Sequence, residues 1–180
     1  MAVARDPSSD DLTNRRGSAL NPKMGLPPFQ TLLDNYALDV HRFLIASVGR
    51  DAADDCYQET WISALRGYPR LRHADNLRGW LLTIAHRKAV DHGRSRQRAA
   101  WPAAELPEIP TSDLTVELLG GSVWPAVAQL PAKQRQAVAL RYALDADYAT
   151  VAATMGTTED AARRNVHEGL KRLRREYERD

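Results

Sequence analysis

The sequence predicts an all-α protein built from two small helical domains that a flexible acidic linker joins. Apolar residues recur at steps of three and four over most of the chain, which is the period of one helix face. No stretch alternates apolar and polar residues as a half-buried strand does, and no segment repeats. Proline and glycine gather in one stretch near the middle of the chain, and this stretch separates the two helical parts.

Composition narrows the class of protein. The chain has 180 residues, of which 43% are hydrophobic and 27% charged, a mix typical of soluble globular proteins. Cys56 is the only cysteine, which excludes an intramolecular disulfide and a cysteine zinc cluster. The sequence has no run of about 18 apolar residues and no apolar signal-peptide segment at its start, so we expect a cytoplasmic protein without a membrane span.

Four segments divide the chain. Residues 1–27 are rich in Ser, Asp, Asn, Pro and Gly and are expected to form a disordered N-terminal tail. Residues 28–98 form the first helical domain and residues 123–180 the second. The linker, residues 99–122, carries acidic residues but no Lys or Arg, and a short helical piece over 114–119 is expected within it.

The first domain begins with two helices. A long amphipathic helix is expected to start after Pro28 and to end at Gly49. The second helix covers residues 52–66, with Asp51 as its N-cap and Gly67 after its end.

The second helix has one acidic face. Asp54 and Gln58, and likewise Asp55 and Glu59, stand four residues apart and lie opposite small residues that include Cys56. Like charges at this spacing slightly destabilise a helix, so the stripe indicates a basic partner, with a merely solvated face as the alternative. Cys56 lies on the inner face, where we expect it to pack.

A loop over residues 68–75 and the third helix mix aromatic and basic residues. Asp75 or Asn76 could cap this helix, which is expected to run to about Gly93. Trp80 lies among cations on it, an arrangement that suits stacking on unpaired bases beside phosphates. A place for Trp80 in the core is the alternative.

Positive charge is concentrated in two places although the formal net charge is only +2. Residues 87–98 hold five cations against Asp91, and residues 163–175 hold six against Glu168. Each cation that neutralises a phosphate releases condensed counterions. Two basic helices in separate domains therefore favour nucleic-acid binding over simple solvation.

The second domain has the spacing of a helix-turn-helix. A helix is expected from Leu130 to about Ala143, followed by a short helix over 147–155 and a turn at Gly156. Thr158 is expected to cap the final helix, which runs to about Tyr177. The buried stripe of this helix is predicted to be Ala162, Val166, Leu170 and Leu173.

The opposite face of the final helix is polar. Its N-terminal turns carry Glu159, Asp160, Arg163, Arg164 and His167. Such turns reach base edges in the major groove, and arginine can donate bidentately to guanine or hold a phosphate. An ordinary helical hairpin is the alternative, but a packing helix would not carry so many cations.

These segments, in this order, resemble the extracytoplasmic-function (ECF) sigma factors of bacterial RNA polymerase, of the sigma-70 family. Residues 53–61 (ADDCYQETW) match the acidic motif of that family, and residues 77–94 (LRGWLLTIAHRKAVDHGR) match its third helix. In the second domain the matching positions are Leu130-Pro131, Gln134-Arg135, Tyr148, Val151-Ala152 and Met155-Gly156. Departures include Asn165 and Glu168, which stand where the family often has Arg, and Gly169, which costs up to about 1 kcal/mol in a helix relative to Ala.

The resemblance implies an alternative sigma factor that binds core RNA polymerase and directs promoter-specific transcription initiation, recognising and melting promoter DNA. It implies core polymerase, promoter DNA and an anti-sigma factor as partners, without cofactor or small-molecule substrate. The residues implied in polymerase docking are Asp54, Asp55, Gln58 and Glu59. Those implied at the −10 element are Arg70, Arg72, His73, Asn76, Trp80, Arg87, Lys88 and Arg94. Those implied at the −35 element are Thr158, Glu159, Asp160, Arg163, Arg164, His167 and Lys171.

Two other functions compete with this interpretation. A helix-turn-helix regulator that acts without polymerase would leave the acidic helix and the aromatic loop without a role. A metal-dependent nuclease could use His86, Asp91 and His92, but the two histidines are six residues apart and so lie on different faces of a helix. The sequence also has no Gly-rich phosphate loop or nucleophile elbow, so we expect no enzyme.

Overall fold

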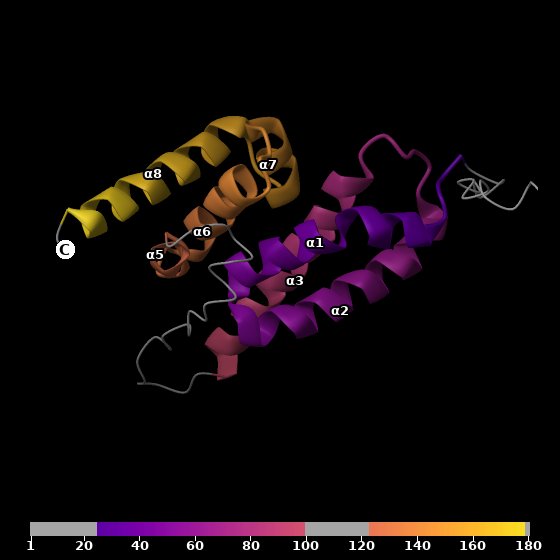
Figure 1. Ribbon diagram of the computed structural model, residues 1–180, viewed down its shortest axis with the longest axis horizontal. Helices are drawn as coiled ribbons and strands as arrows, with labels where there is room; N and C mark the ends of the chain where they lie inside the picture. Colours follow the sequence, from indigo (N-terminus) through magenta and orange to yellow (C-terminus); the bar gives the residue numbers. More distant parts are fainter. Residues whose placement is uncertain (1–24, 100–122, 179–180) are drawn as a thin grey trace, which may run out of the picture.

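The computed structural model describes residues 25–99 and 123–178, which are helical and contain no strand (Figure 1). This confirms the all-α class. The first domain holds α1 (Phe29–Val48), α2 (Arg50–Gly67), the 3₁₀ turn η1 (Tyr68–Arg70) and α3 (Leu77–Ala99). The second holds α5 (Trp124–Ala128), α6 (Ala132–Val138), its π-helical continuation η2 (Ala139–Ala143), α7 (Tyr148–Met155) and α8 (Glu159–Tyr177).

Two predicted segments lie largely outside these residues. The linker, with its expected helical piece, is not among the described residues, and nor is most of the N-terminal tail. Residues 25–27 of the tail are described and packed: Leu26 is buried, and the Tyr68 hydroxyl donates to the carbonyl of Pro27. The ordered part of the first domain therefore starts before Pro28.

Helix α1 ends at Gly49, as predicted. Gly49 has a φ of 82° and its N–H donates to the Ile45 carbonyl over 3.0 Å, a conformation that glycine adopts without a side-chain clash. Helix α2 starts at the next residue, Arg50. The predicted N-cap Asp51 is therefore wrong, because Asp51 lies inside the first turn, and Gly67 is the last residue of α2 and does not follow it.

Helix α3 is capped by Asn76, which decides between the two predicted caps. Its Oδ1 accepts from the Gly79 N–H over 2.8 Å. The helix continues to Ala99, beyond the predicted end at Gly93. Glycine inside a helix lowers stability without ending the helix when the following residues are helix formers.

The second domain confirms the helix-turn-helix. Asp147 caps α7 through its carboxylate, which accepts from the Thr150 N–H over 2.7 Å. Gly156 is left-handed, with φ at 62°. Thr158 caps α8, its hydroxyl accepting from the Ala161 N–H over 3.2 Å. Helix α5, which the sequence did not predict, precedes this unit.

One predicted core position of α8 is wrong. Leu170 is 38% exposed, whereas Gly169 is buried. A Cβ built at Gly169 would lie 2.8 Å from Val138 Cγ2. Helices α6 and α8 therefore approach so closely that the contact point has no room for a side chain, and Leu170 turns outward.

The two domains pack on each other. Helix α3 contacts α7, and α1 contacts α5, α6 and η2. One continuous cluster of buried side chains extends through both domains. Figure 1 shows α2 on the side of the first domain that faces away from α6 and α7. The polar face of α2 is therefore left open by the second domain.

Arg78 links the domains. Its Nε donates to Asp39 Oδ2 of α1 over 2.6 Å, and its Nη2 donates to the Leu144 carbonyl, in the loop before α7, over 2.7 Å. The side chains of Arg78 and Asp39 are each about one third exposed or less.

No helix among the described segments is long and apolar enough to cross a membrane.

Candidate functional site

The acidic stripe of α2 is exposed as the sequence predicted. Asp54, Asp55, Gln58 and Glu59 are all exposed, and the opposite face of the helix is buried. The buried face consists of Ala52, Ala53, Cys56, Thr60, Trp61 and Ala64. Small inner residues bring α2 close to its neighbours and hold the carboxylates outward on a rigid helix.

Two of the acids have partners within the first domain. Glu59 Oε2 lies 3.2 Å from Lys88 Nζ of α3, and Asp54 Oδ1 lies 3.2 Å from His41 Nε2 of α1. In the described ranges Asp55 makes no ion pair. Lys88, which the resemblance placed at the −10 element, therefore lies at the edge of the acidic stripe.

Two apolar side chains continue this face of α2. Ile62 is 49% exposed and Leu65 is 57% exposed, and they follow Gln58 at helical steps of four and three. Exposed apolar residues next to a charged patch mark protein–protein contact. These two residues were not among the predicted site residues, although their spacing from Gln58 and the acids places them on the same helix face.

The candidate −10 residues form two groups. Arg70, Arg72 and His73 are exposed in the loop after α2, with Asn76 at the start of α3. The Asn76 side chain is already used as the helix cap. Arg87 and Arg94 are exposed two turns apart on α3 and so lie on one face. The loop and α3 thus present cations at both ends of the domain.

Trp80 lies between core and surface. It is half-buried, packs against the core and has its ring 6.3 Å from that of Tyr68. Tyr68 is itself buried, with its ring 5.3 Å from that of Phe29. Trp80 is therefore partly accessible to solvent, whereas Tyr68 is not.

Helix α8 presents its N-terminal turns to solvent. Thr158, Glu159, Asp160, Arg163, Arg164, His167 and Lys171 are all exposed. Arg163 is bound from its own helix: Nη2 lies 3.0 Å from Glu159 Oε2 and Nη1 lies 3.8 Å from Asp160 Oδ1. The Thr158 hydroxyl is occupied as the cap.

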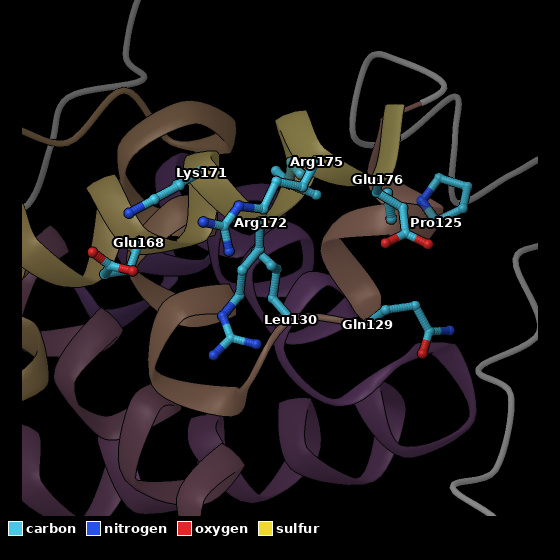
Figure 2. Close-up of a pocket in the computed structure, with 10 residues that line it drawn as sticks. Pro125, Gln129, Leu130, Glu168, Lys171, Arg172, Arg175 and Glu176 are labelled. Atoms are coloured by element: carbon cyan, nitrogen blue, oxygen red, sulfur yellow. The ribbon is translucent and has the colours of Figure 1, made fainter. Parts of the chain in front are cut away.

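Lys171 lies apart from Arg163. It lines a groove of about 600 Å³ between α5 and the C-terminal half of α8 (Figure 2). Figure 2 shows Leu130 at the groove, below Arg172, and Glu176 facing Pro125. The other lining residues are Ala126, Gln129, Glu168, Leu173 and Arg175. The structure thus separates Lys171 from the N-terminal turns of α8.

The residues of the competing nuclease function are not assembled into a metal site. His86 is half-buried, and burial, helped by Arg87, lowers the pKa of its imidazole. In the part of the chain that the structure covers, no three His, Cys, Asp or Glu side chains are grouped so that they could hold a metal ion.

The chain combines a helix-turn-helix with an acidic helix and basic helix faces. This combination is typical of a protein that takes part in transcription. The family Sigma-70 region 2 matches residues 32–99, and the family Sigma-70, region 4 matches residues 122–173. RNA polymerase sigma factor CarQ of Myxococcus xanthus is 31% identical over 156 residues, which cover 81% of this chain and 87% of CarQ. The chain belongs to the ECF group of sigma-70 family sigma factors.

Other comparisons agree. ECF RNA polymerase sigma factor SigX of Bacillus subtilis is 26% identical over 162 residues, which cover 83% of this chain and 84% of SigX. Two solved structures share the fold. Sigma factor RpoE of Bartonella quintana, in complex with the anti-sigma factor NepR, has a TM-score of 0.65 at 24% identity and covers 82% of this chain and 94% of its own. CnrH, in complex with the cytosolic domain of CnrY, has a TM-score of 0.62 at 17% identity, and the match covers 84% of this chain and 88% of CnrH.

Proposed function

We propose that this chain binds core RNA polymerase through α2 and directs promoter-specific transcription initiation. The observation that carries the proposal is the exposed acidic stripe of α2 on the same chain as a helix-turn-helix whose reading turns are open to solvent. A plain DNA-binding regulator needs only the second feature. The function requires no catalytic step by the chain itself, and it is exerted where the polymerase is, in the cytoplasm.

The docking surface combines charge with apolar contact. The acidic stripe attracts a basic partner at long range and fixes its register. Ile62 and Leu65, half exposed at the end of the stripe, supply apolar area that is buried on binding. The partner surface that fits is therefore a basic helical element with an apolar end, as a coiled coil of the polymerase would provide.

The first domain is proposed to open the −10 element. Exposed cations on the loop and on α3 hold the phosphates, and Trp80 stacks on a base that leaves the duplex. Extruding a base costs a few kcal/mol of stacking and pairing, and stacking on an aromatic ring returns about 1–3 kcal/mol per base. The free energy that stacking on Trp80 and phosphate contacts with its cationic neighbours would supply is thus of the right order to offset that cost.

Helix α8 is proposed to read the −35 element. Its first turns stand clear of the domain, which is how the second helix of such a motif enters the major groove. Arg163 and Arg164 are the residues whose donors match guanine or phosphate. We further propose that an anti-sigma factor binds this chain, as NepR and CnrY do in the complexes of the two structural relatives.

Charge reversal on α2 tests the proposal. Asp55→Lys with Gln58→Lys reverses the charge at the centre of the stripe and leaves the Glu59–Lys88 pair in place. Gln30→Lys with Asp34→Lys is the matched control, because it changes one exposed Gln and one exposed Asp on one face of α1 and the charge change is identical.

The measurement is the affinity for core polymerase by fluorescence anisotropy at several salt concentrations. We expect the α2 variant to bind at least about tenfold more weakly, an effect of about 1.4 kcal/mol, with a wild-type circular dichroism spectrum. The control should bind like wild type. Equal affinity of both variants and wild type would show that the α2 stripe is not the docking surface, and absence of binding by the wild type itself would favour a regulator that acts without polymerase.

A further inference from the structure

Two arginines lie over the ring of Tyr148, the first residue of α7. The Arg163 guanidinium carbon lies 5.0 Å from the ring centroid, and that of Arg141 lies 5.6 Å from it. Both distances are within the range of cation–π attraction, about 6 Å. The ring therefore joins α8 to the segment that precedes α7, next to the turns of α8 that face solvent.

Three side chains among the described residues hold the Arg163 guanidinium. Glu159 and Asp160 contact it from its own helix, at 3.0 and 3.8 Å, and the Tyr148 ring contacts it from α7. The arginine side chain is still 53% exposed. Its orientation is thus set in the free protein although half of it remains available to a partner.

The two kinds of contact respond differently to DNA. Exposed ion pairs are weakened by salt and compete directly with phosphates for the guanidinium. Glu159 and Asp160 are also repelled by the phosphate backbone. The tyrosine ring carries no charge, so its attraction for the guanidinium face persists while the N–H donors at the edge bond to a base or phosphate.

We propose that Tyr148 is a positioning residue for Arg163, holding its guanidinium in the orientation in which it reads one base of the −35 element. The inference rests on the proposed function of α8. A long side chain held in advance loses less conformational entropy when it binds. Bidentate recognition depends on orientation, so loss of the ring lowers discrimination between bases more than it lowers binding to all sequences.

Arg141 lies over the same ring but is fixed by other groups. Its Nη1 lies 3.3 Å from Asp145 Oδ1 and 3.3 Å from the Ala146 carbonyl. Its guanidinium carbon also lies 5.7 Å from the centroid of the Tyr142 ring, so Arg141 keeps three contacts to its own segment. Among the described residues, Tyr148 is the one side chain outside α8 that holds the Arg163 guanidinium. The effect of removing the ring falls mainly on Arg163.

The test compares Tyr148→Phe, which keeps a ring, with Tyr148→Leu, which removes it at similar size. Holoenzyme assembled from core polymerase and each variant is titrated with promoters that carry every base at each −35 position. We expect Tyr148→Phe to discriminate within about twofold of wild type. Tyr148→Leu and Arg163→Ala should each reduce discrimination at one and the same position by about tenfold, the order of one bidentate contact.

The double variant separates positioning from other roles. Tyr148→Leu should have no further effect on discrimination when Arg163 is already alanine. If Tyr148→Leu weakens binding to all promoters equally, both with Arg163 present and in the Arg163→Ala background, the proposal is overturned, and Tyr148 contacts the DNA backbone or has a structural role. If Arg163→Ala leaves every position unchanged, Arg163 does not read a base, and the proposal for Tyr148 fails with it; if Arg164→Ala is silent as well, the proposed function of α8 fails too.

Folding is controlled separately. Thermal unfolding of each variant shows whether the domain is intact, and Tyr148→Met, an unbranched apolar replacement that suits a helix, is used if the leucine variant unfolds. The proton chemical shifts of the Arg163 side chain in the free protein give a direct readout. They should move downfield, toward random-coil values, on loss of the ring and stay in place in Tyr148→Phe. Unchanged shifts in the variant without a ring would also overturn the proposal.

Discussion

Replacing Gly169 by alanine tests how closely α8 packs on α6. In an exposed helix this change stabilises by about 1 kcal/mol, because alanine has the better helix propensity. Here the new methyl group would lie 2.8 Å from Val138 Cγ2 and 3.4 Å from Leu130 Cδ1. Val138 is 3% exposed and is branched at Cβ, so its side chain cannot rotate away freely.

The two effects oppose each other. Forcing a methyl group into a packed core costs about 1–3 kcal/mol. The better helix propensity of alanine offsets about 1 kcal/mol of this cost. We therefore expect a net loss of about 1 kcal/mol in the free energy of unfolding. For a protein of this size the corresponding fall in melting temperature is about 3 °C.

Urea unfolding followed by circular dichroism measures this loss, and Val138→Ala provides the partner variant. Val138→Ala alone is destabilising because it leaves a cavity. Combined with Gly169→Ala it makes room for the new methyl group, so the double variant should lose less than the sum of the single variants. A Gly169→Ala protein that is about 1 kcal/mol more stable than wild type would refute the steric argument.

Three further predictions concern single side chains. Arg78→Ala removes both links, to Asp39 and to Leu144, and should raise the radius of gyration measured by small-angle scattering. Arg87→Ala is an exposed control on α3, and equal radii of gyration for the two variants would contradict the link. Trp80→Ala should impair open-complex formation, measured by permanganate footprinting, more than closed-complex binding, and normal opening would count against the stacking role. Cys56 is buried, and burial, with Glu59 and Asp55 adding to it, raises the pKa of its thiol. Because less thiolate is present at a given pH, we expect alkylation by iodoacetamide at pH 8 at least about tenfold slower than in urea, and equal rates would show that the thiol is accessible.

Local rules of the chain predicted much of the fold. Gly49 and Gly156 end α1 and α7 because both adopt positive φ, and Thr158 caps α8 as its side chain allows. Asp147, which was expected inside the short helix, is instead the cap of α7. The acidic stripe followed from the helical period alone. These features depend on residues within one or two turns of each other, which is the range that sequence patterns describe.

Features that depend on contact between helices were missed. Leu170 is apolar and was expected inside, but the distance between α6 and α8 selects Gly169 at the contact. Helix α5 has five residues, too few to show a period. The Glu59–Lys88 pair and the Arg78 link join residues far apart in the sequence, and the periodicity of a single helix carries no information on such pairs.

The packing of the two domains affects how promoter DNA is engaged. The −10 and −35 elements lie about 25 base pairs apart, a separation of about 85 Å at 3.4 Å per base pair. In the packed arrangement α3 contacts α7, and contacting helices have axes about 8–10 Å apart. On the proposed function, the domains therefore have to separate before the first domain and α8 can engage both elements.

On the proposed function, the form that fits both elements is therefore one with the domains apart, and the apparent affinity for the whole promoter scales with the fraction of the free protein in that form. A partner that binds the separated domains shifts this population by its differential affinity for the two forms. On the proposed function, the contact between α3 and α7 makes promoter recognition depend on assembly with polymerase, since DNA alone would have to supply the free energy of separation.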